Sequence, residues 1–274
     1  MMNLPLNQFK AWMQERRKPV PLGTWMMTHS AQVSEAMGFA GFDFLVLDME
    51  HVPVDSADAV TIMRALEGTP TKGGQIVVRL PWNDPIIVKR LLDGGATTLM
   101  FPFIQNADEA RSAVASTRYP LDGNGGTRGC AAVHRASRYG AIPNYLKTAN
   151  DSVCTIMQIE TPEALANIPA IAAVEGVDAV FIGPGDLSAN MGYLGNIANE
   201  DVRHALKTGV DAVHAAGKPC GIVLGNPEMV RWAIELGYDF VAIGSDMSML
   251  LARAKEQIAA VRGEKQQQAA GGVY

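Results

Sequence analysis

The chain has 274 residues, of which 48% are hydrophobic, so it can bury one large α/β core or two ordinary ones. Its formal charge of −5 at pH 7 and its lack of long basic runs argue against a nucleic-acid-binding surface. No run approaches the ~20 apolar residues of a membrane span, and charges interrupt the N-terminal segment, unlike the apolar core of a signal peptide. Cys154 and Cys220 lie in apolar runs without a CxxC pair, which indicates buried thiols in a reducing compartment, the cytoplasm.

Apolar runs alternate with helical patterns along the whole chain. Strands are predicted at Val20–Met27, Phe42–Leu47, Gln75–Leu80, Thr97–Phe101, Val153–Ile159, Val177–Ile182, Lys218–Val223 and Asp239–Ile243. Helices are predicted at Ser30–Gly38, Asp55–Glu67, Asp84–Asp93, Ala107–Ser116, Tyr139–Thr148, Asp201–Ala216 and Ser245–Arg262, with two more beginning at Thr161 and Asn226. The stretch Pro120–Arg138 is the longest predicted loop.

Three of the predicted helices begin with a polar cap followed at once by proline: Asp84-Pro85, Thr161-Pro162 and Asn226-Pro227. This repeated strand-to-helix turn and the eight strands favour one (β/α)₈ barrel over residues 1–262. A doubly wound sheet would need a glycine-rich phosphate loop after the first strand, and Gly23-Thr24-Trp25 is not one. The polar segment 263–274 is predicted to be a disordered tail.

Two carboxylates end neighbouring predicted strands. Glu160 follows the fifth strand and Asp186 follows the sixth, and parallel neighbours lie about 4.8 Å apart, so the two acids could share one divalent cation. Each residue also has a structural interpretation: Glu160 could favour the helix dipole from the first helical turn, and Asp186 could cap a helix. Their occurrence on adjacent strands favours the metal site.

Other polar residues also fall at strand ends, where a barrel keeps its active site. His51 follows the second strand in the company of Asp48 and Glu50, and Arg79 ends the third strand. A lone loop histidine and a structural ion pair are the plain alternatives. A guanidinium can equally hold a carboxylate or an enolate oxygen, and this set contains no lysine for a Schiff base.

At these residues the chain resembles a known family. The segments FDFLVLDMEHVPVD, VVRLPWNDPIIVKRLLDGG, MQIETPEALANI, EGVDAVFIGPGDLSANMGYLGN and FVAIGSDMSMLLA are similar to the HpcH/HpaI aldolases, the metal-dependent class II pyruvate aldolases, which include enzymes for 4-hydroxy-2-oxoheptanedioate and 2-dehydro-3-deoxyglucarate. The resemblance extends from about Gly23 to Arg262. Met49 and Gly185 depart from the family's usual residues.

The resemblance implies a fold, an assembly and an activity. These are a TIM barrel whose last helix is swapped between subunits, and a homohexamer built as a trimer of dimers. The implied reaction is the reversible cleavage of a 4-hydroxy-2-oxo acid to pyruvate and an aldehyde, such as succinic or tartronate semialdehyde, in aromatic or sugar-acid catabolism. The implied cofactor is Mg²⁺, Mn²⁺ or Co²⁺, with no organic cofactor.

The resemblance also implies a role for each site residue. Glu160 and Asp186 would bind the metal, His51 would be the general base, and Asp93 would be its acid partner. Arg79 would bind the enolate, and Gln158 and the backbone at Gly185 and Asp186 would bind the substrate. Trp25 and Val223 would form the wall on the aldehyde side. Two other functions stay open: a citrate-lyase-like enzyme acting on a coenzyme A thioester, and a non-catalytic barrel that binds a 2-oxo acid.

Overall fold

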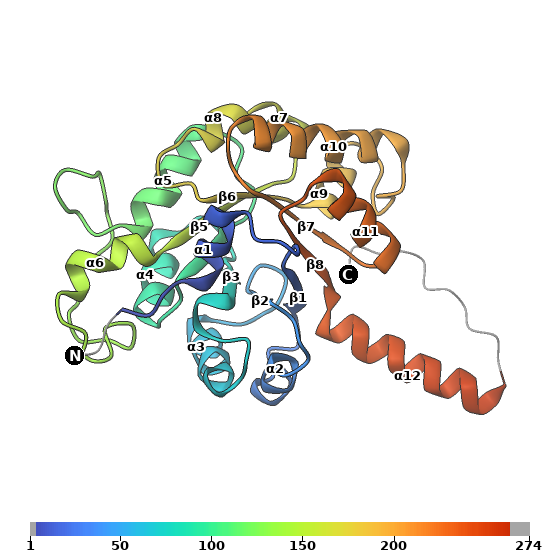
Figure 1. Cartoon of the computed structure of the whole chain (residues 1–274), viewed down its shortest axis with the longest axis horizontal. Helices are drawn as coiled ribbons and strands as arrows, with labels where there is room; N and C mark the ends of the chain where they lie inside the picture. The colour runs from blue at the N-terminus through green and yellow to red at the C-terminus, as the bar shows by residue number, and fades with distance from the viewer. Residues whose placement is uncertain (1–3, 264–274) are drawn as a thin grey trace.

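A computed structural model describes residues 4–263 as a closed barrel of eight parallel strands with helices outside it (Figure 1). Each strand pairs with its sequence neighbours, and β8 closes the barrel against β1. The strands are β1 (Leu22–Met26), β2 (Phe44–Asp48), β3 (Ile76–Arg79), β4 (Thr98–Phe101), β5 (Cys154–Ile159), β6 (Ala179–Ile182), β7 (Cys220–Leu224) and β8 (Phe240–Ser245). The predicted single-domain (β/α)₈ barrel is confirmed.

Helices cover the outside of the barrel and one of its ends. The α-helices are α1 (Gln8–Glu15), α2 (Ala31–Gly38), α3 (Ser56–Ala65), α4 (Pro85–Asp93), α5 (Ala107–Thr117), α6 (Tyr145–Ser152), α7 (Pro162–Ala166), α8 (Ile168–Ala172), α9 (Pro184–Asn190), α10 (Glu200–Ala215), α11 (Pro227–Leu236) and α12 (Asp246–Arg262); two 3-10 turns are η1 (Leu66–Gly68) and η2 (Gly73–Gln75). Short α9, directly after β6, was not predicted.

The three cap–proline turns form as the sequence predicts. The side chains of Asp84, Thr161 and Asn226 accept hydrogen bonds from backbone N–H groups in the first turns of α4, α7 and α11, and each helix begins with proline. These turns fix where each chain segment leaves the barrel. The helix predicted from Tyr139 was wrong in its start: Tyr139 and Asn144 have left-handed backbones, so α6 begins only at Tyr145.

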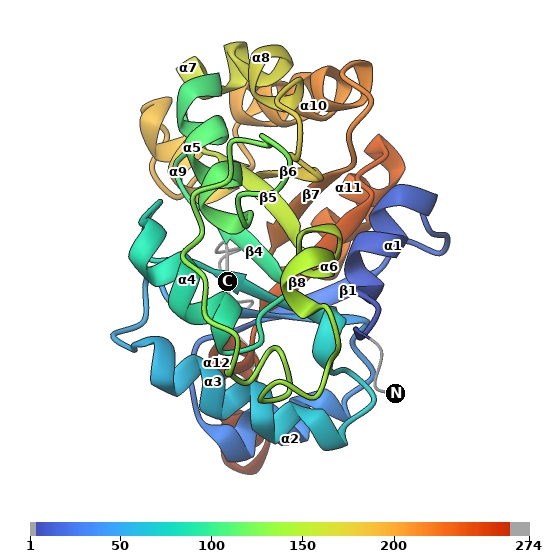
Figure 2. The same cartoon turned by 90° about the vertical axis from the view of Figure 1, so that its left-hand side faces the viewer.

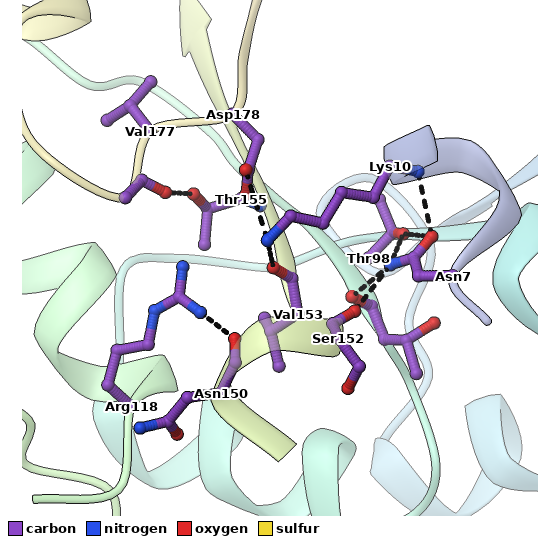
Figure 3. A network of polar contacts seen from close by, with 12 residues as sticks. Asn7, Lys10, Thr98, Arg118, Asn150, Ser152, Val153, Thr155, Val177 and Asp178 are labelled. Carbon is purple, nitrogen blue, oxygen red and sulfur yellow. Dashed lines mark hydrogen bonds and ion pairs between the residues drawn. The ribbon is translucent and has the colours of Figure 1, made fainter. Parts of the chain in front are cut away.

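Helix α1 closes the amino-terminal end of the barrel. The Phe9 ring centroid lies 5.3 Å from that of Phe44 and 5.2 Å from that of Phe240, both inside the barrel. The Asn7 amide donates to the carbonyl oxygens of Thr97 and Ser152, at 3.0 and 2.9 Å, in the network drawn in Figure 3. Because this end is plugged by aromatic packing and polar anchors, solvent reaches the barrel interior from the carboxyl ends of the strands.

Helix α12 leaves the barrel. It extends away from the other helices in Figure 1, and Asp246, in its first turn, is its one buried residue among those described. Of the predicted tail 263–274, only Gly263 is described, as the left-handed cap of α12, and the rest lies outside the described residues. Within residues 4–263 no helix is both long and apolar enough to cross a membrane.

Candidate active site

A cavity of about 260 Å³ opens at the carboxyl ends of the strands. Eight of the nine site residues named from the sequence line it, and they come from six different strand ends. These residues are Trp25, His51, Arg79, Gln158, Glu160, Gly185, Asp186 and Val223. The barrel therefore brings together side chains that are up to about 200 positions apart in the sequence. The ninth residue, Asp93, is not part of this cavity.

Glu160 is a buried carboxylate at the floor of the cavity. It follows β5, its exposed fraction is 1%, and its two oxygens accept hydrogen bonds from the Gln158 amide (2.6 Å) and the Phe103 backbone N–H (3.0 Å). Burial raises the pKa of Glu160 to about 8; the Gln158 hydrogen bond opposes this, whereas Glu50 and Asp186 add to it by repulsion. A carboxylate held in this state gains stability from any cation placed beside it.

Asp186 supplies the second carboxylate. It lies in the first turn of α9, directly after β6, and its side chain is exposed. Residues 4–263 contain no cluster of three or more His, Cys, Asp or Glu side chains able to hold an ion. A cation between Glu160 and Asp186 would thus complete its coordination with oxygens from water or substrate.

Two further features fit a cation beside Glu160. The Gln158 Oε1 atom is buried without a hydrogen-bond partner, so it can accept from a water or a hydroxyl group entering the cavity. Gly183 leaves room where a Cβ atom would lie only 2.5 Å from the Glu160 Oε1 atom. Glycine at this position therefore leaves space for the Glu160 carboxylate to face the cavity while it accepts its two hydrogen bonds.

Arg79 is buried and clamped by two carboxylates. Its guanidinium forms a bidentate pair with Asp48 at 2.9 and 2.8 Å, and its Nη1 atom lies 2.9 Å from a Glu50 oxygen. The same group lies 4.2 Å from the centroid of the Trp25 ring. These contacts fix the plane of the guanidinium at the cavity wall. Arg79 can therefore be both a structural ion pair and a ligand-binding group, because the ion pair orients its guanidinium.

His51 lies in the turn after β2 and is exposed at the cavity rim. Its neighbour Glu50 is partly buried. Burial raises the pKa of Glu50, and Arg79 and His51 oppose this shift by attraction. The segment Asp48–His51 therefore has two parts. Its two acids hold Arg79, and its histidine faces solvent, where it can exchange a proton.

Asp93 occupies a different place. It is the last residue of α4, and its carboxylate pairs with the Arg128 guanidinium at 2.7 Å, while the His134 Nε2 atom lies at 3.6 Å. Helices that follow barrel strands run back toward the amino-terminal end, so Asp93 is remote from His51 within one chain. The sequence pattern already contained this signal, because Asp93 ends the helix predicted after the third strand and such a helix ends near the amino-terminal side of the barrel.

The cavity also contains residues that sequence reasoning did not single out. Phe181, Pro184, Ala189 and Leu194 complete its wall, and the Leu194 side chain is 85% exposed at the rim. No lysine is among the described residues that line this cavity. Of the two departures from the resembled family, Gly185 lines the cavity, whereas Met49 packs in the hydrophobic core with 4% exposure.

Comparison with known proteins gives consistent matches over nearly the whole chain. Residues 22–252 match the model of the HpcH/HpaI aldolase/citrate lyase family. A 2-dehydro-3,6-dideoxy-6-sulfogluconate aldolase of Pseudomonas putida is 48% identical, covering 94% of this chain and 99% of its own. A 4-hydroxy-2-oxo-heptane-1,7-dioate aldolase of Shigella sonnei is 45% identical, covering 98% of this chain and 99% of its own. A crystal structure of a family protein from Burkholderia cenocepacia superposes with a TM-score of 0.88 at 38% identity, covering 93% of this chain and 99% of that one.

Proposed function

The chain belongs to the HpcH/HpaI aldolase/citrate lyase family and is a carbon–carbon lyase, and from this premise we propose that it is a class II pyruvate aldolase. Its reaction would be the reversible cleavage of a 4-hydroxy-2-oxo acid to pyruvate and an aldehyde. The observation that carries the proposal is the buried Glu160 beside Asp186, at the floor of a cavity that also contains Arg79 and His51.

Glu160 and Asp186 would hold a divalent cation, Mg²⁺, Mn²⁺ or Co²⁺. The support is the burial of Glu160, the unpartnered Gln158 Oε1 atom and the space left by Gly183. When bound, such a cation would act as a Lewis acid toward the oxygens of a 2-oxo acid. No organic cofactor is required, because the charge that develops is on oxygen and the site offers cationic groups for it.

The chain's own residues would position the substrate around these acids. Arg79, held by Asp48 and Glu50, would place a fixed positive charge beside the substrate carbonyl, where negative charge grows as the bond breaks. Backbone N–H groups at Gly185 and Asp186 would bind the substrate carboxylate, with Gln158 on the same wall. The fixed guanidinium needs no rearrangement during the reaction, which is what makes such a contact effective in a transition state.

His51 would act as the general base. It would take the proton of the C4 hydroxyl as the C3–C4 bond breaks; the electron pair of that bond would pass into the pyruvate enolate, and the C4 carbon would leave as the aldehyde carbonyl. The enolate would then take a proton at C3, supplied through water from the protonated His51, to become pyruvate. In the aldol direction His51 would return its proton to the new alkoxide. Its exposed position lets water restore its protonation state between turnovers.

The aldehyde would lie against Trp25 and Val223, next to Phe181. Relatives of this chain are named for a heptanedioate and for a sulfogluconate, which would yield acidic aldehydes, and succinic or tartronate semialdehyde are the candidates here. Such substrates belong to aromatic or sugar-acid catabolism. The buried thiols of Cys154 and Cys220 suit a reducing cytoplasm, the location we propose.

We further propose a homohexamer, a trimer of dimers in which α12 is swapped. The support is the exposed apolar face of α12, which includes Leu250, Leu251 and Ile258 at 59%, 50% and 49% exposure. Asp93 could then assist His51 only from a neighbouring subunit, because it lies outside the cavity of its own chain.

The assembly predicts a change in mass when α12 is altered. The wild-type protein should sediment as six copies of the 29.3 kDa chain, and the double substitution Leu250→Glu, Leu251→Glu should release smaller species, since charges oppose apolar burial between subunits. Lys255→Glu, on the same helix, is the control and should keep the wild-type mass. Sedimentation velocity reads the difference. A monomeric wild-type protein would disprove the assembly.

The activity predicts pyruvate release that depends on a metal. Protein treated with a chelator should release no pyruvate from 4-hydroxy-2-oxo acids, and adding Mg²⁺, Mn²⁺ or Co²⁺ should restore release, measured by coupling to lactate dehydrogenase. Silence with every metal and substrate would reject the aldolase. Binding of a coenzyme A thioester in calorimetry would then favour the citrate-lyase-like alternative, and binding of a 2-oxo acid without turnover would favour a non-catalytic barrel.

A further inference from the structure

A second and larger cavity, of about 490 Å³, lies at the opposite end of the barrel, and we call it the lower cavity. Its lining includes residues at the starts of strands: Ile76 is the first residue of β3, and Thr97 comes directly before β4. The N-terminal segment, the long loop and α6 complete its wall, and Figure 2 views the molecule from this side. The proposed active site, at the carboxyl ends of the strands, therefore shares no lining residue with the lower cavity.

The lower cavity is positively charged. Its lining contains three cationic side chains, Lys72, Arg135 and Arg138, and one carboxylate, Glu67. One Glu67 oxygen serves both arginines, at 2.5 Å from Arg135 and 3.4 Å from Arg138. The chain as a whole has a net charge of −5, so the positive charge of this cavity is opposite in sign to that of the whole protein. Glu67 is the one carboxylate among the described residues of this lining and neutralises only part of the positive charge. An anion entering the cavity would therefore be attracted to the remaining positive charge.

The cations differ in how they are held. Arg135 is fixed, because its guanidinium also donates to the Gly94 carbonyl oxygen at 2.7 Å and its side chain is 14% exposed. Arg138 and Lys72 are exposed at the cavity rim, and the Arg138 side chain is 47% exposed. Arg135 thus belongs to the wall, whereas Arg138 and Lys72 can turn toward a ligand at low cost.

The cavity also has an apolar body and an unsatisfied polar atom. Met63, Ile76 and Tyr145 are buried residues on its wall and offer an apolar surface. The Thr97 Oγ1 atom is buried on the same wall and has no hydrogen-bond partner. Buried hydroxyl groups are normally paired, so this atom is a hydrogen-bonding position on the wall that a water or a bound molecule would fill. The volume is within the range that small organic ligands occupy.

We propose that the lower cavity is a binding site for an organic anion, a carboxylate attached to an apolar body, which would act as an effector apart from the catalytic substrates. Arg138 and Lys72 hold the carboxylate, the Met63 and Tyr145 wall covers the apolar part, and Thr97 binds a polar substituent. An ion without an apolar body leaves most of the cavity unfilled, and a neutral body leaves the cations without a partner. Both features are therefore needed for tight binding.

Isothermal titration calorimetry with three probes tests this composition. Naphthalene-2-carboxylate combines charge and apolar body, its neutral amide keeps only the body, and acetate keeps only the charge. We expect the first to bind one molecule per chain and the other two to bind at least tenfold more weakly. No binding of naphthalene-2-carboxylate at millimolar concentration, or equal binding of the neutral amide, would overturn the proposal.

Variants place the binding in the lower cavity. The double substitution Lys72→Gln, Arg138→Gln should weaken naphthalene-2-carboxylate at least tenfold, and Ala136→Leu should weaken it by filling space without changing charge. Lys207→Gln, on α10, removes an exposed cation elsewhere and should leave the affinity unchanged. Binding should also persist in Glu160→Gln, which separates this site from the catalytic one. Affinity that survives the double substitution and falls in Glu160→Gln would move the ligand to the catalytic cavity and reject the proposal.

Discussion

Replacing Glu160 by glutamine is expected to abolish metal binding and pyruvate release while making the metal-free protein more stable at alkaline pH. The folded-state pKa of Glu160 is raised, to about 8, above its ordinary value of 4.5. Ionised Glu160 therefore costs stability: the cost is absent below pH 4.5, grows as pH rises, and is complete above pH 8. At about 1.4 kcal/mol per pKa unit, the cost reaches the order of 5 kcal/mol.

Glutamine avoids this cost and can keep the local hydrogen bonds. Its oxygen can accept from the Phe103 N–H group, and its amide can donate to the Gln158 Oε1 atom, which has no partner in the wild-type protein, once the Gln158 amide rotates. We therefore expect a net gain of about 2–4 kcal/mol at pH 9, which is several degrees in melting temperature, and no gain at pH 4.5. Carboxylate loss meanwhile removes one of the two proposed metal ligands.

Differential scanning calorimetry in the presence of a chelator, from pH 5 to pH 9, measures the difference between the two proteins. Glu163→Gln, in the exposed first turn of α7, is the matched control and should show no pH-dependent gain. In the wild-type protein, the affinity for Mn²⁺ should rise by up to tenfold per pH unit up to about pH 8, because binding displaces the Glu160 proton. A stability difference that is the same at pH 5 and pH 9 would show that burial of Glu160 does not control its ionisation.

The barrel could be predicted from the sequence because its signals are local and repeated. Apolar runs with β-branched residues mark the strands, and a polar cap followed by proline, as at Thr161-Pro162, marks the helix starts. Helix α1 was missed as the plug of the barrel, because its packing of Phe9 against Phe44 and Phe240 is a contact between distant segments. Left-handed backbones such as that of Asn144 likewise have no clear signal in a polar loop.

The candidate site was predictable to the extent that strand ends meet. Glu160 and Asp186 follow adjacent parallel strands, and this alone brings them to one cavity. The clamp on Arg79 required the register, in which Asp48 lies opposite Arg79 on the neighbouring strand. Asp93 ends a helix that was predicted correctly, and the direction of that helix already places it at the other end of the barrel. The lower cavity depends on how loops fold back at that end, and neither composition nor periodicity records that. Sequence patterns therefore specify which groups meet at strand ends, and loop geometry decides the rest.

Substituting His51 by alanine is expected to lower turnover by about 10²–10⁴-fold, the usual contribution of a general base, with little change in stability. His51 is exposed and makes no hydrogen bond that anchors the fold among the described contacts, so its removal leaves no buried group unsatisfied. Glu160, Asp186 and Arg79 keep their places, and binding of Mn²⁺ and of pyruvate should stay within about threefold of wild type. The loss should fall on kcat and leave KM nearly unchanged, because the proton moves only in the transition state.

A proton-transfer role has a further signature that a positioning role lacks. Added imidazole should restore part of the His51→Ala activity, since a free base can enter the space left at the cavity rim and take the hydroxyl proton. His204→Ala, at an exposed histidine on α10, is the control and should have wild-type kinetics with no response to imidazole. Steady-state kinetics of pyruvate release, with calorimetry for Mn²⁺ and pyruvate, measures all of these quantities. If His51→Ala retained turnover within tenfold of wild type, the base would have to be a water held by Glu160 and Asp186, and the exposed histidine would serve only the entry of the substrate.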